Sequence, residues 1–85
     1  MKIELRDPSK GPVYAQVREQ VENQIRDKTI ATGEVLPSPA ALAQELAVDR
    51  GEVQRAYFEL EQAGLLKRAT SKDFLGMAKI TYRVA

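Results

Sequence analysis

Side chains suited to contacting a polyanion gather at the C-terminal end of this sequence. Residues 1–66 hold eight Lys and Arg against eleven Asp and Glu, a net charge of −3, whereas residues 67–85 hold five against one, a net charge of +4. This division favours one surface that faces a polyanion, although uneven charge is also common in small domains. The candidates for phosphate contact here are Lys67, Arg68 and Lys72.

A second group of candidates begins at Arg50, at the start of a predicted helix. When a helix lies in the major groove of DNA, its first turn contacts the bases. Gln54, one turn after Arg50, has an amide that can bind adenine through two hydrogen bonds. Gly51 would let a partner approach the backbone closely. Arg55 lies toward the flank, where it would meet phosphate or an acidic neighbour. The alternatives are a surface arginine paired with a carboxylate and a solvated glutamine.

Enzyme chemistry finds little support in the composition. The chain has no cysteine and no histidine, so a thiol nucleophile, a zinc finger and the commonest general base are absent. Ser9, Ser38 and Ser71 have no basic partner for nucleophilic catalysis. No apolar run approaches the roughly 20 residues of a membrane span. We therefore expect neither an enzyme nor a bound cofactor or metal, no membrane partner, and a cytoplasmic location.

The elements that must position these residues follow from periodicity and turn signals. Alternation over residues 2–6 predicts a short strand. Helical spacing predicts a helix over 13–28, and Ser38 and Asp49 are candidate N-caps for helices over 39–47 and 50–63, with Gly64 closing the latter. Residues 30–37 are expected to form a loop. Strands are predicted over 65–69 and 78–84, joined by a hairpin loop at 70–77.

This order predicts a winged helix-turn-helix in a single domain over residues 1–85. The fold class is mainly α with a small β-hairpin (α+β): three helices, a wing and a short N-terminal strand. The length of 85 residues is sufficient for one modest core.

Several segments in order resemble the DNA-binding domain of the bacterial GntR-family transcription regulators, especially the YtrA-like subgroup. The matching pieces are Pro12–Val17, Gly33–Ser38, Leu42–Arg50, Val53–Ala56 and Leu60–Leu66. The resemblance implies a transcription regulator that binds double-stranded DNA. The helix over about 50–63 would be the recognition helix in the major groove. The wing near 70–77 would lie on the backbone or in the minor groove.

The sequence departs from the family pattern at several contact positions. Pro39–Ala40 replaces a Glu-Arg pair whose arginine contacts DNA, and Gln54 replaces an arginine. Gly51 and Glu52 stand where small hydroxyl residues are usual, and Ser71–Asp73 replaces a glycine-rich wing tip. Ser38 could donate to phosphate, but an N-cap role also explains it.

Glu52 is the residue that most opposes DNA binding. A carboxylate at the start of a recognition helix repels phosphate. It would be harmless if it closed a capping box with Asp49, pointing back at the backbone. It could also accept a hydrogen bond from a cytosine amino group.

Phe58 is out of phase with the apolar stripe of its helix, which predicts partial exposure. It would either pack under the wing or mark a subunit or partner contact. The alternative function is therefore a winged-helix protein-interaction module with reduced or lost DNA binding.

Family members usually carry an effector domain after the wing. In this sequence no such domain and no small-molecule effector site are visible, which fits either an excised domain or a stand-alone protein. Binding across a palindrome would require a homodimer contact that the sequence does not locate.

Overall fold

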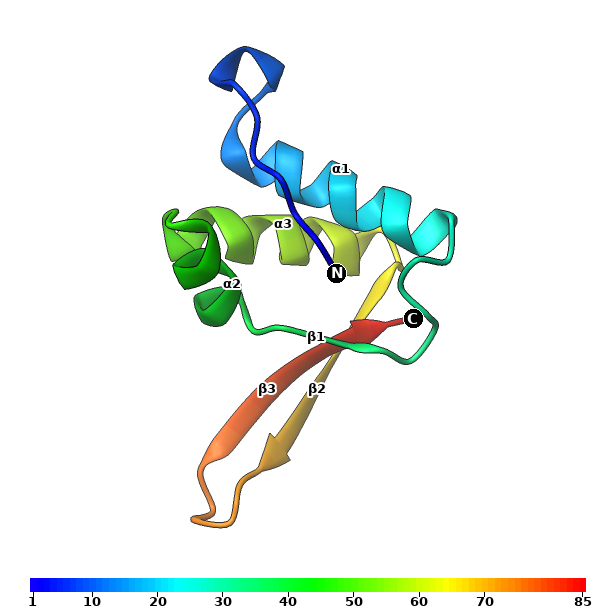
Figure 1. Ribbon diagram of the computed structural model, residues 1–85. Helices are drawn as coiled ribbons and strands as arrows, with labels where there is room; N and C mark the ends of the chain where they lie inside the picture. The colour runs from blue at the N-terminus through cyan, green and yellow to red at the C-terminus, as the bar shows by residue number, and fades with distance from the viewer.

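Three helices pack above a small antiparallel sheet in the computed structural model, which describes all residues 1–85 (Figure 1). The sheet has the strand order β1-β3-β2. This arrangement confirms the predicted winged helix-turn-helix. The elements, in chain order, are a 3-10 turn η1 (Pro8–Lys10), α1 (Val13–Arg26), β1 (Val35–Leu36), α2 (Pro39–Leu46), α3 (Arg50–Gln62), β2 (Leu66–Lys72) and β3 (Ala78–Val84).

The ends of α2 and α3 lie where the cap residues predict them. The hydroxyl of Ser38 accepts from the amide of Ala41 at 3.1 Å, and the carboxylate of Asp49 accepts from the amide of Gly51 at 2.7 Å. Gly64 follows α3 with a φ of +79°, which glycine adopts without the strain that a side chain brings. These local contacts fix the two helices of the helix-turn-helix.

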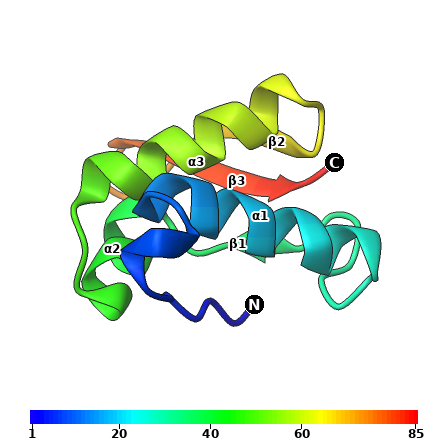
Figure 2. The same ribbon diagram turned by 90° about the horizontal axis from the view of Figure 1, so that it is seen from above.

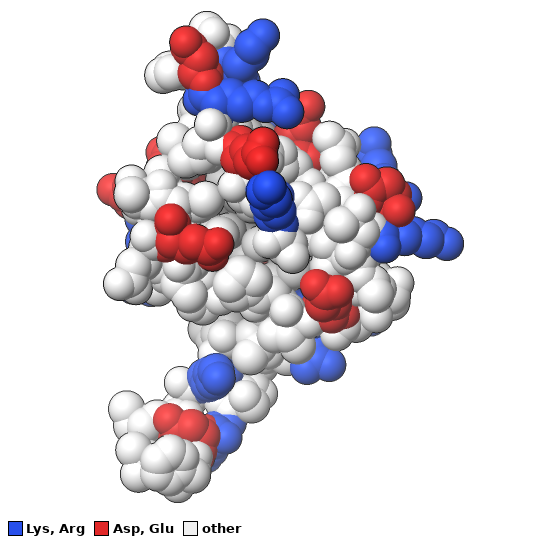
Figure 3. All heavy atoms as spheres, in the orientation of Figure 1, with Lys and Arg blue, Asp and Glu red and all other residues white.

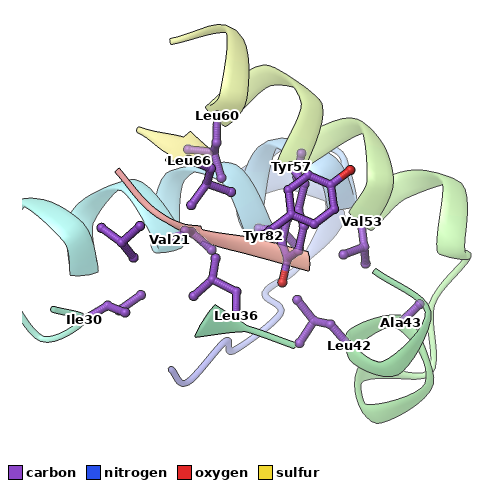
Figure 4. Close-up of a cluster of buried hydrophobic side chains, with 13 residues drawn as sticks. Val21, Ile30, Leu36, Leu42, Ala43, Val53, Tyr57, Leu60, Leu66 and Tyr82 are labelled. Atoms are coloured by element: carbon purple, nitrogen blue, oxygen red, sulfur yellow. The ribbon is translucent and has the colours of Figure 1, made fainter. Parts of the chain in front are cut away.

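The core lies between the three helices and the sheet (Figure 4). The predicted stripe of α3, Val53, Ala56, Tyr57 and Leu60, is buried. The ring of Tyr57 meets that of Tyr82 edge to face, with centroids 5.1 Å apart. The hydroxyl of Tyr57 donates to the carbonyl of Pro37 at 2.8 Å, so this buried polar group has a hydrogen-bond partner. Burial raises the pKa of Tyr57 well above its ordinary value.

The third strand of the sheet is not the one predicted. The loop expected over 30–37 contains β1, in which Val35 pairs with Arg83 and Leu36 with Tyr82. Two residues are too few to show a strand alternation in the sequence. β1 therefore ties the segment before α2 to the base of the wing.

The N-terminal strand predicted over residues 2–6 is wrong. The segment is extended and lies alongside α1 (Figure 2), and its backbone bonds to three glutamines of that helix instead of to a strand. Gln20 accepts from the amide of Glu4 at 2.8 Å and donates to its carbonyl at 2.6 Å. Gln24 bonds both groups of Lys2 in the same way, and Gln16 both groups of Arg6. We call this set the glutamine ladder.

The geometry of the ladder follows from two repeats that nearly match. Four residues of helix rise about 6 Å, and two residues of extended chain span about 6.6 Å. Glutamines at positions i, i+4 and i+8 therefore meet alternate residues of a chain running antiparallel to α1. The side chains of Ile3 and Leu5, between these contacts, pack against the core. The alternation in residues 2–6 is real, but its partner is a helix.

The β2–β3 hairpin projects away from the helices (Figure 1). Its strands are paired from Leu66 and Val84 out to Lys72 and Ala78. β2 is longer than predicted, so the connecting loop is residues 73–77 instead of 70–77. No helix is both long and apolar enough to cross a bilayer.

Candidate nucleic-acid interface

The exposed side of α3 carries three of the predicted contact residues near its N-terminus. Arg50, Gly51 and Gln54 are all exposed. Arg50, Gln54 and Phe58 follow one another at four-residue spacing, which places them on the same side of the helix. The carboxylate of Asp49 accepts from the amide of Gly51, and the absence of a side chain at Gly51 lets a partner approach the backbone of this turn closely.

A shallow hollow joins this side of α3 to α2 and to the base of the wing. Its volume is about 160 Å³, and its polar lining includes Ser38, Arg50 and Gln54, with Ile80 and Tyr82 contributed by β3. Ala40, where the family pattern has an arginine, also lines it. The structure therefore brings Ser38 together with Arg50 and Gln54, although they come from different elements.

Glu52 faces away from this hollow. Its Oε2 accepts a hydrogen bond from the backbone amide of Tyr14 at 2.9 Å, in the first turn of α1. Its carboxylate makes no bond to the amide of Asp49, so the predicted capping box is wrong. The box requires only local geometry, whereas Tyr14 is supplied by a helix that packs against α3. Glu52 caps α1 instead.

Arg55 also faces α1 and not the hollow. Its guanidinium carbon lies 3.8 Å from the centroid of the Tyr14 ring, and its Nε lies 3.2 Å from a carboxylate oxygen of Glu59. Arg18 of α1 bonds the other oxygen of Glu59. Hydrogen bonds from Arg18 and Arg55 hold the pKa of Glu59 below its ordinary value. Of the two partners expected for Arg55, the structure shows the acidic neighbour.

The basic residues of the wing divide between the two faces of the hairpin. Partners directly opposite each other share a face. Arg68 lies opposite Tyr82 and Lys72 opposite Ala78, whereas Lys67 lies opposite Arg83. Arg68 also pairs with Glu61 of α3 at 3.6 Å. Lys67, Arg68 and Lys72 are all exposed.

Two further cations were not selected as site residues from the sequence. Lys79 and Arg83 are exposed on β3, on the same face as Lys67, and neither forms an ion pair within the chain. The alternation of Lys79, Thr81 and Arg83 in the predicted strand was the signal that could have identified them. The wing therefore carries cations on both faces.

Phe58 has 48% of its surface exposed, which confirms the exposure predicted from its phase. Ile80, on the wing, is 50% exposed. Ile80 lines the hollow itself, and Phe58 lies one helical turn beyond Gln54 on the same side of α3.

Comparison with known proteins matches both the sequence and the fold. The profile described as "Bacterial regulatory proteins, gntR family" matches residues 13–74. An uncharacterized HTH-type transcriptional regulator, YhcF of Bacillus subtilis (strain 168), is 30% identical over 59 residues, which are 69% of this chain. This chain spans 49% of the length of that relative.

Solved structures of similar fold include a transcription factor and a DNA-binding domain in complex with its operator. YtrA from Sulfolobus acidocaldarius, a GntR-family transcription factor, superposes with a TM-score of 0.70 at 28% identity, covering 99% of this chain and 63% of its own. The AraR(DBD) in complex with operator ORX1 superposes with a TM-score of 0.71 at 25% identity, covering 100% of this chain and 96% of its own. The fold is thus similar to that of a domain solved on its operator.

Proposed function

Because the chain belongs to the gntR family of bacterial regulatory proteins, we propose that this DNA-binding transcription regulator inserts α3 into the major groove and lays its wing on the adjacent backbone or minor groove. The observation that carries the proposal is the meeting of Ser38, Arg50 and Gln54 around one hollow. The operator complex of the similar AraR domain supports it.

The side chains at the hollow suit base and phosphate contacts. Arg50 is positioned to bind a guanine edge or a phosphate, and Gln54 to bind adenine through its amide. The hydroxyl of Ser38 donates to a backbone phosphate while it caps α2. Gly51 lets the backbone of α3 approach the groove.

The wing supplies the charge for counterion release. Lys67 and Lys72, together with Lys79 and Arg83, form no ion pair within the chain and are available to phosphates. Arg68 divides its charge between Glu61 and a phosphate. Arg55 contributes to the α1–α3 contact and less to DNA, because Tyr14 and Glu59 already engage it.

The orientation of Glu52 removes the main objection to DNA binding. Its charge lies at the positive N-terminal end of α1, where a carboxylate is favourable. The hollow around Arg50 and Gln54 is therefore free of the Glu52 carboxylate, and Asp49, the carboxylate that remains at the N-terminus of α3, accepts from the amide of Gly51.

The test is selection of bound duplexes from a random DNA pool, followed by fluorescence anisotropy on the selected site. Arg50→Ala and Gln54→Ala should each weaken binding about 5-fold to 150-fold, the range for a base contact. Gln62→Ala is the matched control, because Gln62 is an exposed glutamine at the far end of α3. Failure to enrich any sequence, or equal effects of Gln54→Ala and Gln62→Ala, would contradict the proposed interface.

Exposure of Phe58 favours one second candidate, a protein-interaction module that uses the same side of α3. Phe58→Ala should then abolish capture of a defined protein partner and leave DNA affinity unchanged. Strong, salt-dependent DNA binding that is lost in Arg50→Ala would exclude this alternative for that face.

A further inference from the structure

The tip of the wing displays large apolar side chains to solvent. Phe74 is 94% exposed, Leu75 71% and Met77 63%, all within the loop that joins β2 to β3. Nothing in the chain covers them, because the hairpin projects away from the helices (Figure 1). Apolar side chains grouped at such a point are a feature of contact surfaces.

The loop that carries these side chains is held by its own hydrogen bonds. The carboxylate of Asp73 accepts from the amides of Leu75 and Met77 at 2.9 and 3.0 Å. The backbone of Asp73 also donates to the carbonyl of Met77 and accepts from the amide of Gly76. Phe74 and Leu75 are therefore presented from a fixed turn, which lowers the entropy cost of inserting them into a partner.

Cations flank this apolar tip. Lys72 ends β2, and Lys79 lies near the start of β3. Asp73, the one acidic residue between 67 and 85, uses its carboxylate on backbone amides of the loop. In Figure 3 the end of the projection is white around one red acidic group, with blue side chains along its stem. The tip of the wing therefore combines exposed apolar side chains with lysines on the two strands that support it.

We propose that Phe74 and Leu75 enter the DNA minor groove and wedge open a base step beside the site contacted by α3. The inference rests on the DNA-binding function proposed above and adds a deformation of the DNA to it. Apolar side chains inserted between base pairs from the minor groove unstack them and kink the duplex. Lys72 and Lys79 would hold the phosphates on either side.

The length of the wing suits this position. Ile80 lies at the hollow beside Gln54 and pairs with Thr70, and Phe74 is four positions beyond Thr70. Fully extended, four positions span about 13 Å, which is the upper limit for this stretch because β2 ends at Lys72. Neighbouring major and minor grooves are separated by about 17 Å, half of the helical repeat. The side chain of Phe74 adds most of the difference.

A second copy of the chain suits the tip less well. One buried aromatic covers about 150–250 Å², so the three tip side chains bury on the order of 500 Å². A standard interface needs about 800 Å² from each partner. The tip alone is too small to hold a stable dimer, whereas a minor groove about 6 Å wide accepts one or two side chains.

The experiment uses the selected duplex with 2-aminopurine placed in turn at each step flanking the α3 site. Binding of the wild-type chain should raise 2-aminopurine fluorescence at one step, because the base there unstacks. Phe74→Ala should remove that signal and weaken binding about tenfold, and Phe74→Leu should retain part of the signal. Lys72→Ala is the control, because it should weaken binding and reduce the salt slope by about 1 while keeping the signal.

Three outcomes would overturn the wedge. If Phe74→Ala keeps both affinity and signal, the wedge is wrong while DNA binding stands. If the wild-type chain binds no duplex and Lys72→Ala changes nothing, the proposed function fails and the wedge with it. If sedimentation shows a dimer that Phe74→Ala dissociates without altering DNA binding, the occupant of the tip is a second copy. Thermal melting checks each variant, and Phe74→Ala should fold normally because its side chain is 94% exposed.

Discussion

The carboxylate of Glu52 in α3 lies 2.9 Å from the backbone amide of Tyr14 in α1. The acid at the start of the proposed recognition helix thus serves as a cap for a different helix. One interaction satisfies an amide that α1 leaves unpaired and turns a negative charge away from the hollow around Arg50. Packing of α1 on α3 therefore decides how the N-terminus of α3 meets a polyanion.

Removing this cap should destabilise the fold. Glu52→Ala leaves the Tyr14 amide without its partner, and loss of a helix cap costs about 1 kcal/mol. Chemical denaturation monitored by circular dichroism gives the free energy of unfolding. Glu45→Ala is the control, because Glu45 is exposed and forms no ion pair. Equal stability of the two variants would contradict the cap.

Because of the cluster of Arg18, Arg55 and Glu59, the free energy of unfolding should decrease at acid pH. Because the folded pKa of Glu59 is lowered, its contribution is present above the pKa of the unfolded chain and is lost as the pH falls through the folded value. Glu59→Gln should therefore be less stable than the wild type at pH 7 and nearly equal to it at pH 2. Denaturant melts at both pH values measure this. A constant difference at the two pH values would show that the charge of Glu59 plays no part.

Arg55 should matter for the stability of the fold and Arg50 for DNA affinity. Arg55→Ala should lower the free energy of unfolding, since it removes the contact with Tyr14 and Glu59, and change DNA affinity little. Arg50→Ala should do the reverse. Melting and anisotropy on the same two variants test the pair, and a loss of affinity in Arg55→Ala as large as that in Arg50→Ala would contradict the assignment.

Tyr57 should reduce stability in alkali. Its pKa is raised by burial, so above about pH 10 the unfolded chain loses this proton while the folded chain keeps it. Stability then falls with pH by about 1.4 kcal/mol per unit. Tyr57→Phe loses the hydrogen bond to Pro37, at a cost of about 1–3 kcal/mol near neutral pH. Because phenylalanine has no proton to lose, Tyr57→Phe escapes this alkaline destabilisation. The difference in free energy of unfolding between the wild type and Tyr57→Phe should therefore narrow between pH 8 and pH 11. A deficit that stays constant would contradict this account.

The glutamine ladder should open locally, without unfolding of the core. Gln20→Ala removes two hydrogen bonds to Glu4 and should increase hydrogen exchange at the amides of residues 2–6, with a small change in global stability. Glu19→Ala, one position away and exposed, is the control. Unchanged exchange at the amide of Glu4 would show that the ladder does not protect it.

The features that the sequence predicts are those that depend on neighbours in the chain. Ser38, Asp49 and Gly64 act within one turn of their own positions, so the bounds of α2 and α3 were predicted to within about one residue. The buried stripe of α3 follows from the helical repeat in the same way. The pairing of residues 66–69 with β3 needed only a hairpin, whereas its extension to Lys72 was not predicted.

The features that were missed depend on residues distant in the chain. Glu52 is 38 positions from Tyr14, and the ladder joins residues up to 22 positions apart. A local rule offered each a nearer partner, a capping box for Glu52 and a strand for residues 2–6. The ion pair of Arg68 with Glu61 also depends on how β2 crosses α3. Of the candidate site, the residue types could be predicted, but the directions of Glu52 and Arg55 could not.

The ladder also affects which sequences the N-terminal segment can tolerate. Gln16, Gln20 and Gln24 bond only main-chain groups: those of Arg6, Glu4 and Lys2 and, for Gln16, also the carbonyls of Asp7 and Gly11. Such groups are the same in every residue except proline, which lacks the amide proton. Positions 2, 4 and 6 should thus accept nearly any other amino acid, whereas 3 and 5 must stay apolar. The segment is free to diversify or to be fused to another polypeptide while α1 continues to hold it.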